Sequence, residues 1–174
     1  MKIYLIGYMA SGKTTRGKEL AEYLNLPWLD LDELLVARSG RSISSWFAQS
    51  GEEAFREAEH ELLHELAISP DSFVLATGGG TPVHFNNMPL MQRTGITVYL
   101  KVSEAELVRR LMADRTNRPL LAGVYEKDVP QVVLAHFHSR ESRYLEAQMI
   151  WAENDTASMI GERITSLGQS VHSR

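Results

Sequence analysis

The segment Gly7–Thr14 reads GYMASGKT and matches the phosphate-binding pattern G-x-x-x-x-G-K-[ST] at every fixed position. It follows the apolar run Ile3–Ile6 and precedes a helix-like stretch, Thr15–Leu24. This order predicts a buried strand, then a loop whose N–H groups surround a polyphosphate, then a helix whose N-terminus faces the same anion. In such a loop Lys13 reaches the β- and γ-phosphates, and the Thr14 hydroxyl holds Mg²⁺. A chance match in a glycine-containing turn is the alternative, which the flanking strand and helix disfavour.

Composition limits the remaining classes. A chain of 174 residues suits one domain with a sizeable core, and 44% hydrophobic with 23% charged residues is ordinary for a globular protein. A net charge of −4 and a pI of about 5.9 argue against a general binder of nucleic acid or membrane surfaces. There is no cysteine, which excludes disulfides, thiolate metal sites and a cysteine nucleophile. Neither a membrane-spanning apolar stretch nor a signal peptide is visible, so we expect a cytoplasmic location.

Short apolar runs alternate with helix-like segments along the whole chain, which predicts a parallel sheet with helices on both faces. The expected strands are Lys2–Ile6, Pro27–Leu29, Phe73–Ala76, Ile96–Leu100 and Met149–Ala152.

Candidate caps mark several helices. Ser50 with Glu53 three residues later predicts a helix through Leu66, and Ser103 with Glu106 predicts another through about Ala113. A further helix is expected over residues 128–148, and a last one, capped by Asp155 or Thr156, ends near residue 168.

Two aspartates follow the second expected strand, in the sequence Leu29-Asp30-Leu31-Asp32. Ligands of parallel sheets bind outside the carboxyl ends of the strands. One carboxylate could therefore meet a metal, while the other orients an acceptor hydroxyl and takes its proton during phosphoryl transfer. The alternative is that Asp30 or Asp32 only caps the next helix.

The third expected strand is followed by Thr77 and by three consecutive glycines, Gly78, Gly79 and Gly80. Glycines allow a backbone to approach a ligand closely, although a flexible turn is the plainer explanation. Because this strand ends in Thr77 and not in an acid, we expect the acid near the metal to be Asp30.

Arginines gather in the second half of the chain, and a guanidinium is the preferred fork for carboxylates and phosphates. Most surface arginines are only solvated, but Arg118 stands out because it precedes Pro119 in an expected loop. An arginine closing over a triphosphate can neutralise charge in the transition state. His60 and His64 form an H-E-x-x-H match on an expected helix, but no third zinc ligand is evident.

Taken together, these segments resemble the shikimate kinase family of small P-loop kinases, which are of the nucleoside-monophosphate-kinase type. The matching motifs span nearly the whole chain: Gly7–Thr15, Asp30–Asp32, Gly40–Ile43, Gly51–Arg56, Gly78–Gly80, Arg118–Leu121 and Arg140 with Tyr144.

The resemblance implies a three-layer α/β/α domain over residues 1–174, with a five-stranded parallel sheet, a mobile substrate-binding region at about 31–60 and a short lid at about 112–124. It implies transfer of the γ-phosphoryl group of ATP to the 3-hydroxyl of shikimate, with Mg²⁺ as cofactor and a monomeric enzyme. The family pattern often has glycine where this chain has Ala10, and a methyl group fits there if φ is negative.

Site residues also follow from the resemblance. The catalytic group would be Lys13, Asp32 and Arg118. ATP would be bound by Ala10, Ser11, Gly12, Lys13, Thr14, Thr15, Arg110 and Arg118. Shikimate would be bound by Asp32, Arg56, Gly78, Gly79, Gly80 and Arg140, and the metal by Thr14 and Asp30.

Two alternatives remain. A related small-molecule kinase, such as one acting on gluconate, would share the phosphate loop and an aspartate after the second strand. A nucleotide-binding regulatory module without acceptor chemistry has less reason to keep Lys13, Thr14, Asp32 and Arg118 together.

Overall fold

A computed structural model describes residues 1–113, 121 and 123–171 of the chain. Five parallel strands form one sheet in the order β2-β3-β1-β4-β5. The strands are β1 (Lys2–Ile6), β2 (Trp28–Asp30), β3 (Phe73–Ala76), β4 (Ile96–Leu100) and β5 (Met149–Trp151). Three of these match the predicted strands residue for residue, while β2 begins and ends one residue later, and β5 ends one residue earlier, than predicted.

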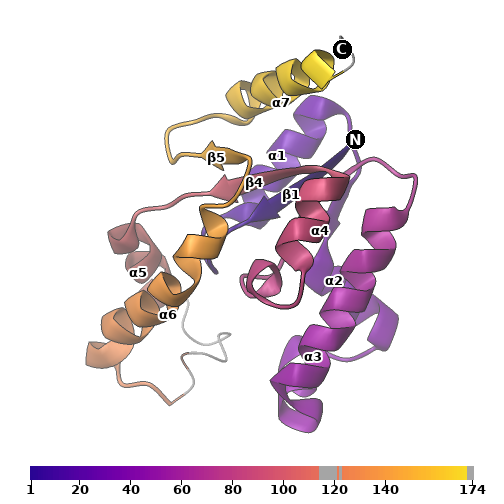
Figure 1. Cartoon of the computed structure of the whole chain (residues 1–174). Coiled ribbons are helices and arrows are strands. Elements are labelled where there is room, and N and C mark those ends of the chain that lie inside the picture. The colour runs from indigo at the N-terminus through magenta and orange to yellow at the C-terminus, as the bar shows by residue number, and fades with distance from the viewer. Residues whose placement is uncertain (114–120, 122, 172–174) are drawn as a thin grey trace.

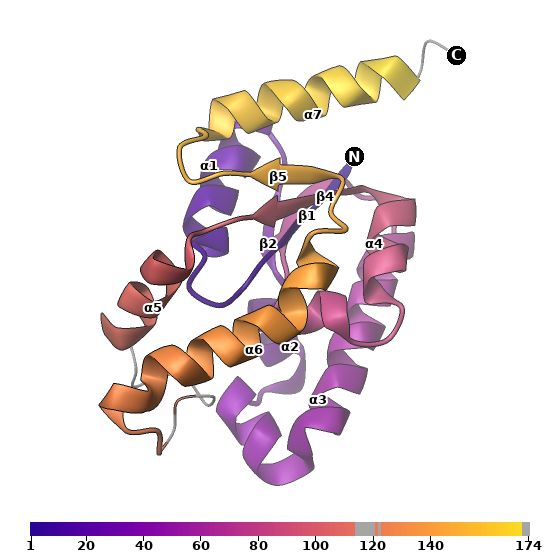
Figure 2. The same ribbon diagram turned by 60° about the vertical axis from the view of Figure 1, so that its left-hand side comes forward.

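Helices cover both faces of this sheet, so the predicted three-layer fold is confirmed (Figures 1 and 2). The helices are α1 (Lys13–Leu24), α2 (Leu31–Ser39), α3 (Ile43–Ile68), α4 (Asn87–Thr94), α5 (Glu104–Ala113), α6 (Val129–Tyr144) and α7 (Ala157–Val171), with short 3-10 turns η1 (Thr81–Val83) and η3 (Glu126–Asp128). Because all strands run the same way, their carboxyl ends meet at one edge of the sheet, and this edge carries the site.

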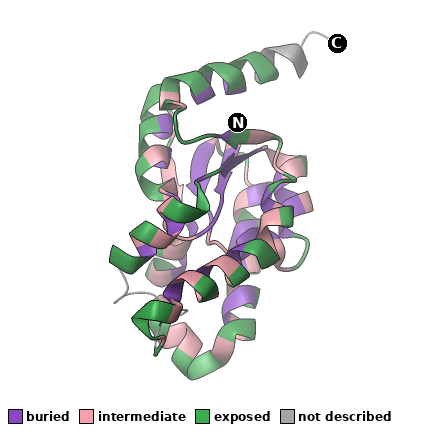
Figure 3. Ribbon diagram, turned by 90° about the vertical axis from the view of Figure 1, so that its left-hand side faces the viewer, coloured by how far each residue is buried: buried purple, intermediate pink, exposed green. Residues whose placement is uncertain are grey.

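The alternation of side chains along β1 separates two apolar clusters. Tyr4 and Ile6 belong to the cluster that α2 to α6 cover, and Ile3 and Leu5 belong to the cluster under α1 and α7. All four side chains are fully buried. In Figure 3 the central strands β1, β3 and β4 are buried along most of their length, while the outer sides of α6 and α7 are exposed. Two-sided burial explains why these three central strands are almost continuously apolar.

A helical segment begins one residue after the predicted start at Ser50, but it continues an earlier helix that the sequence did not predict. The helix α3 begins at Ile43, where the Ser42 side chain accepts a hydrogen bond from the Ser45 N–H, and its backbone leaves helical geometry at Gly51 with φ 81° and ψ 172°. The helix is therefore broken one residue after Ser50. The apolar stripe predicted beyond this break is present, since Phe55 is buried in the larger cluster.

The predicted start of α5 is confirmed, but the predicted capping box is absent among the described contacts. Glu106 accepts from Arg109 and Arg110, and the Ser103 hydroxyl donates to Glu153. At α7, Thr156 is the cap: its side-chain oxygen accepts from the Met159 N–H at 3.3 Å. No helix in the described part of the chain is both long and apolar enough to cross a membrane.

Candidate active site

The phosphate loop connects β1 to α1 through a backbone that only certain residues tolerate. Gly7 has φ 145° and Gly12 has φ 92°, and a Cβ on Gly7 would lie 3.0 Å from the Leu100 carbonyl oxygen. Ala10 also has positive φ, at 61°, so the expectation of a negative φ at this position is wrong. The left-handed conformation costs a non-glycine residue about 1 kcal/mol. The Ala10 carbonyl oxygen accepts from Arg110 Nη1 at 3.0 Å, which stabilises this conformation.

Lys13 is folded against its own loop. Its Nζ donates to the carbonyl oxygens of Gly7 and Tyr8, each at 2.9 Å. The first residue of α1 is Lys13 itself, and no side chain caps this helix at Gly12. The N–H groups of the first helical turn therefore face the loop, as required for an anion at a helix N-terminus.

Thr14 and Asp30 bring two hard oxygen donors together from neighbouring elements. The Thr14 hydroxyl donates to Asp30 Oδ2 at 3.4 Å, and Asp30 Oδ1 accepts from the backbone N–H groups of Asp32 and Glu33. The capping alternative is thus correct for Asp30, but it uses one oxygen and leaves the other facing Thr14. A carboxylate and a hydroxyl suit Mg²⁺, which prefers oxygen ligands and keeps several waters.

Asp32 lies in the first turn of α2, not on the strand, and is half-buried. Burial is the main cause that raises its pKa from 3.8 to about 6, and the nearby Glu59 and Asp30 raise it further, while Lys13 and Arg56 lower it. Asp32 therefore stands within electrostatic range of both the phosphate lysine and an acceptor-side arginine. A carboxylate whose pKa lies this close to neutrality suits proton acceptance at physiological pH.

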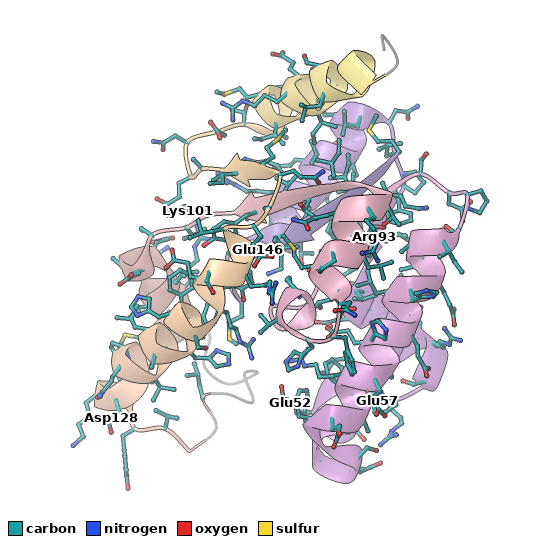
Figure 4. All side chains as sticks on the ribbon, viewed as in Figure 1. Glu52, Glu57, Arg93, Lys101, Asp128 and Glu146 are labelled. Atoms are coloured by element: carbon teal, nitrogen blue, oxygen red, sulfur yellow. The ribbon has the colours of Figure 1, made fainter. Side chains whose placement is uncertain are left out.

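Arg56 is 9% exposed and is held by two glutamates of its own helix. Its Nη1 donates to Glu59 Oε2 at 2.8 Å, and its Nε donates to Glu52 Oε1 at 3.3 Å. Glu59 is fully buried and also accepts from the Thr81 hydroxyl at 2.6 Å. Figure 4 labels Glu52 on the side of α3 that faces α6.

Sequence reasoning missed Glu59. The available signal was its spacing: Glu59 follows Arg56 by three residues, which puts both side chains on one helix face, next to the apolar stripe of Phe55. Burying a charge is costly unless the charge is paired, so a buried arginine next to an apolar stripe predicts a glutamate partner on the same face.

Two of the three consecutive glycines, Gly78 and Gly80, are required for space. A Cβ on Gly78 would lie 2.6 Å from a Glu59 carboxylate oxygen, and one on Gly80 would lie 2.5 Å from the Arg56 guanidinium. The Gly79 carbonyl oxygen accepts from the Tyr144 hydroxyl at 2.6 Å. A flexible turn does not explain Gly78 and Gly80, because the loop packs closely against the buried ion pair at these two positions.

Arg140 projects from α6 toward the same region. Its positive charge lowers the pKa of the Tyr144 hydroxyl, although burial outweighs this effect and raises that pKa to about 12. Arg140 also acts on His136, one turn earlier, and on His84, after η1; burial is the main cause that lowers the pKa of each histidine, and Arg140 lowers it further. The structure therefore brings Arg140, Asp32, Arg56 and the glycine loop to one end of the sheet.

A cavity of about 350 Å³ lies between the phosphate loop, α5 and the segments that follow β4 and β5. Arg110 lies at its wall, where Nε donates to Glu106 at 2.7 Å. The full lining is Ser11, Arg16, Val102, Ser103, Glu106, Arg110 and Glu153. Arg16, which the sequence did not single out, lies over the Trp151 ring at 5.2 Å and donates to the Ala152 carbonyl oxygen. Thr15 is exposed at the start of α1.

Two predicted features are not brought into the site. Arg118, like most of the predicted lid, lies outside the described residues. His60 and His64 lie on α3, where His60 Nδ1 shares a 2.6 Å hydrogen bond with Asn87 Oδ1 and its ring stacks on Phe85. Among the described residues no group of three or more His, Cys, Asp or Glu side chains could hold a metal ion.

Comparisons with known proteins point to one family. A family model described as shikimate kinase matches residues 9–168. A shikimate kinase from Parabacteroides distasonis is 40% identical over 161 residues, which covers 92% of this chain and 91% of the relative. One from Azobacteroides pseudotrichonymphae is 41% identical over 150 residues, covering 86% and 88%.

Solved structures of shikimate kinases have the same fold as this chain. The crystal structure of shikimate kinase from Bacteroides thetaiotaomicron has a TM-score of 0.84 at 36% identity and covers 97% of this chain and 98% of that one. Shikimate kinase from Acinetobacter baumannii in complex with shikimate has a TM-score of 0.84 at 33% identity, covering 97% and 93%.

Proposed function

The chain belongs to the shikimate kinase family, and we propose that its site transfers the γ-phosphoryl group of ATP to the 3-hydroxyl of shikimate. The products are ADP and shikimate 3-phosphate. The observation that carries the assignment of residues is the position of Asp32, whose charge interacts with both Lys13 and Arg56. A carboxylate between a phosphate-binding lysine and an acceptor-binding arginine stands where the two substrates must meet.

On the donor side, the phosphate loop binds the triphosphate. Backbone N–H groups of Ala10 to Thr15 and the N-terminus of α1 surround the phosphates, and Lys13 exchanges its carbonyl partners for β- and γ-phosphate oxygens. Thr14 and Asp30 would hold Mg²⁺, which neutralises phosphate charge when bound. The cavity beside Arg110 offers room for the nucleoside.

On the acceptor side, each end of shikimate has its own partners. Arg56 and Arg140 hold the carboxylate, because a guanidinium is the preferred fork for a carboxylate, and ion pairs with Glu59 and Glu52 orient Arg56 for this contact. The glycine loop gives the sugar-like ring a close backbone surface. Asp32 binds the hydroxyl end, orients the 3-hydroxyl toward the γ-phosphorus and accepts its proton as the P–O bond forms.

The rest of the chain supports these contacts as one domain. We assign residues 31–60 to the acceptor-binding region, which closes on shikimate, and Arg118 to charge neutralisation over the phosphates. The enzyme acts as a monomer.

An ADP-release assay with ATP and shikimate, gluconate or buffer alone tests the proposal. We expect release that depends on shikimate. Release with gluconate only would assign the chain to a different acceptor, and ATP binding without release in any arm would support a regulatory nucleotide-binding module.

A further inference from the structure

One face of α6 contacts two loops of the site and carries Arg140 between these contacts. His136, Arg140 and Tyr144 are spaced by four residues, so they lie one above the other on the helix. His136 contacts the phosphate loop through Tyr8, and Tyr144 contacts the glycine loop through the Gly79 carbonyl oxygen. Arg140, expected to bind shikimate, stands between these two contacts.

Tyr8 joins the phosphate loop to this face. Its ring is 1% exposed and packs edge-on against His136 and Phe137, with ring centroids 5.5 and 5.6 Å apart. Its hydroxyl shares a 2.8 Å hydrogen bond with His136 Nδ1 and donates to the Val133 carbonyl oxygen at 3.3 Å. The backbone carbonyl of the same residue accepts from Lys13 Nζ. One residue therefore touches α6 with its side chain and the phosphate lysine with its backbone.

We propose that His136 is a positioning residue, which acts through Tyr8 to hold the phosphate loop and Lys13 in register with Arg140. This inference rests in part on the proposed phosphotransfer, which requires the donor phosphate and the acceptor hydroxyl to be aligned. A loop fixed to α6 keeps the donor phosphate aligned with the acceptor that the same helix binds, and small misalignments cost large factors in rate.

The surroundings of His136 favour an uncharged ring. Burial lowers its pKa to about 4, and the charges of Arg140 on α6 and Arg56 on α3 lower it further, while Glu52 on α3 opposes them. Because the Tyr8 hydroxyl gives its one hydrogen to the Val133 carbonyl oxygen, a neutral imidazole with its proton on Nδ1 donates to Tyr8, and it adds no cation next to the shikimate carboxylate.

Substitutions at both ends of the hydrogen bond test the proposal. His136→Leu and Tyr8→Phe each remove the bond, and Tyr8→Phe keeps the buried ring. His136→Asn places an amide near the position of Nδ1 and preserves the bond. His138→Leu is the matched control, because His138 lies two residues away on the same helix, with a half-exposed side chain that pairs with Glu104.

Two measurements are made on each variant: the Kd of the non-hydrolysable analogue AMP-PNP with Mg²⁺, and kcat with ATP and shikimate. We expect His136→Leu and Tyr8→Phe each to raise the Kd and lower kcat about 3- to 10-fold, the double variant to be no worse than either, and His136→Asn to recover most of the loss. His138→Leu should stay within 2-fold of the wild type.

The inference is overturned if both quantities stay within 2-fold in His136→Leu and Tyr8→Phe while only the melting temperature falls, because that is the result of a purely structural contact. It is also overturned if His136→Asn is no better than His136→Leu. A wild type without shikimate-dependent ADP release would refute the proposed function alone, and the AMP-PNP affinities would then still decide the role of His136.

Discussion

The donor half and the acceptor half of the site are built in different ways. The phosphate loop is eight consecutive residues whose work is done by backbone groups and one lysine. The acceptor half consists of side chains from α2, α3 and α6 and a loop after β3. Its Arg56 is fixed by a buried ion pair with Glu59. A backbone site tolerates changes in most of its side chains, whereas a side-chain site depends on each partner. The predictions below separate the two halves, from the largest expected effect to the smallest.

Breaking the buried ion pair should have the largest effect. Glu59→Ala leaves Arg56 without its closest partner and the Thr81 hydroxyl without an acceptor, so we expect the free energy of unfolding to fall by about 3 kcal/mol or more. Urea unfolding measures this change. The control is Glu57→Ala, an exposed position on the same helix that Figure 4 labels, where the change should stay below about 0.5 kcal/mol. Equal losses in the two variants would contradict the role given to the pair.

Removing the carboxylate of Asp32 should affect turnover and spare nucleotide binding. Asp32→Asn loses the proton acceptor, and we expect kcat to fall by about 100-fold or more while the Kd for AMP-PNP changes less than about 3-fold. Steady-state kinetics and calorimetry measure the two quantities. An unaltered kcat would reject Asp32 as the group that orients or deprotonates the acceptor.

The same substitution should change how stability depends on pH. The folded-state pKa of Asp32 is raised to about 6, so its stabilising contribution is fully present below about pH 4 and is lost as pH rises through 6. Relative to Asp32→Asn, the wild type should lose about 2 to 3 kcal/mol of unfolding free energy between pH 4 and pH 7. Parallel stability curves for the two proteins over this range would show that the carboxyl group titrates normally.

Arg140→Ala should discriminate between the two substrates. We expect the KM for shikimate to rise about 10-fold or more, with a change of less than about 3-fold for ATP, because a guanidinium–carboxylate contact is lost. Arg143→Ala, on the same helix and exposed in a pair with Glu146, serves as the control. Equal weakening of both substrates would refute the carboxylate assignment.

Relieving the phosphate loop should have the smallest effect. Ala10→Gly removes the cost of positive φ but enlarges the freedom of the unfolded chain, so we expect a gain of about 0.5 kcal/mol in unfolding free energy. Ala105→Gly, at an exposed helical position, should instead lose about 0.5 to 1 kcal/mol. A loss of similar size in Ala10→Gly would mean that the loop is not strained at this residue.

The same contrast explains what could be predicted from the sequence. The strands were predictable because burial on both faces leaves continuous apolar runs, as in Phe73–Ala76, and the phosphate loop was predictable because its residues are contiguous. The sequence predicts a helix start near Gly51, where the structure has a break within α3. The reason is that a serine–glutamate pair predicts a cap but does not show whether another helix precedes that cap.

The acceptor half was predictable only in part. Motif resemblance pointed to Arg56, but its dependence on Glu59 and the close approach of Gly78 and Gly80 arise from packing between distant segments. The contact of His136 with Tyr8 joins residues 128 positions apart, and no local pattern marks it.

The two edge strands of the sheet, β2 and β5, are only three residues long, while the apolar strands β3, β1 and β4 lie between them. Unpaired N–H and C=O groups on a long apolar edge would template pairing with another chain. Here the most apolar strands lie in the middle of the sheet, and each edge strand exposes too few backbone N–H and C=O groups to pair with a strand of another chain. Brevity of the outer strands thus protects a chain whose central strands are among its most apolar segments.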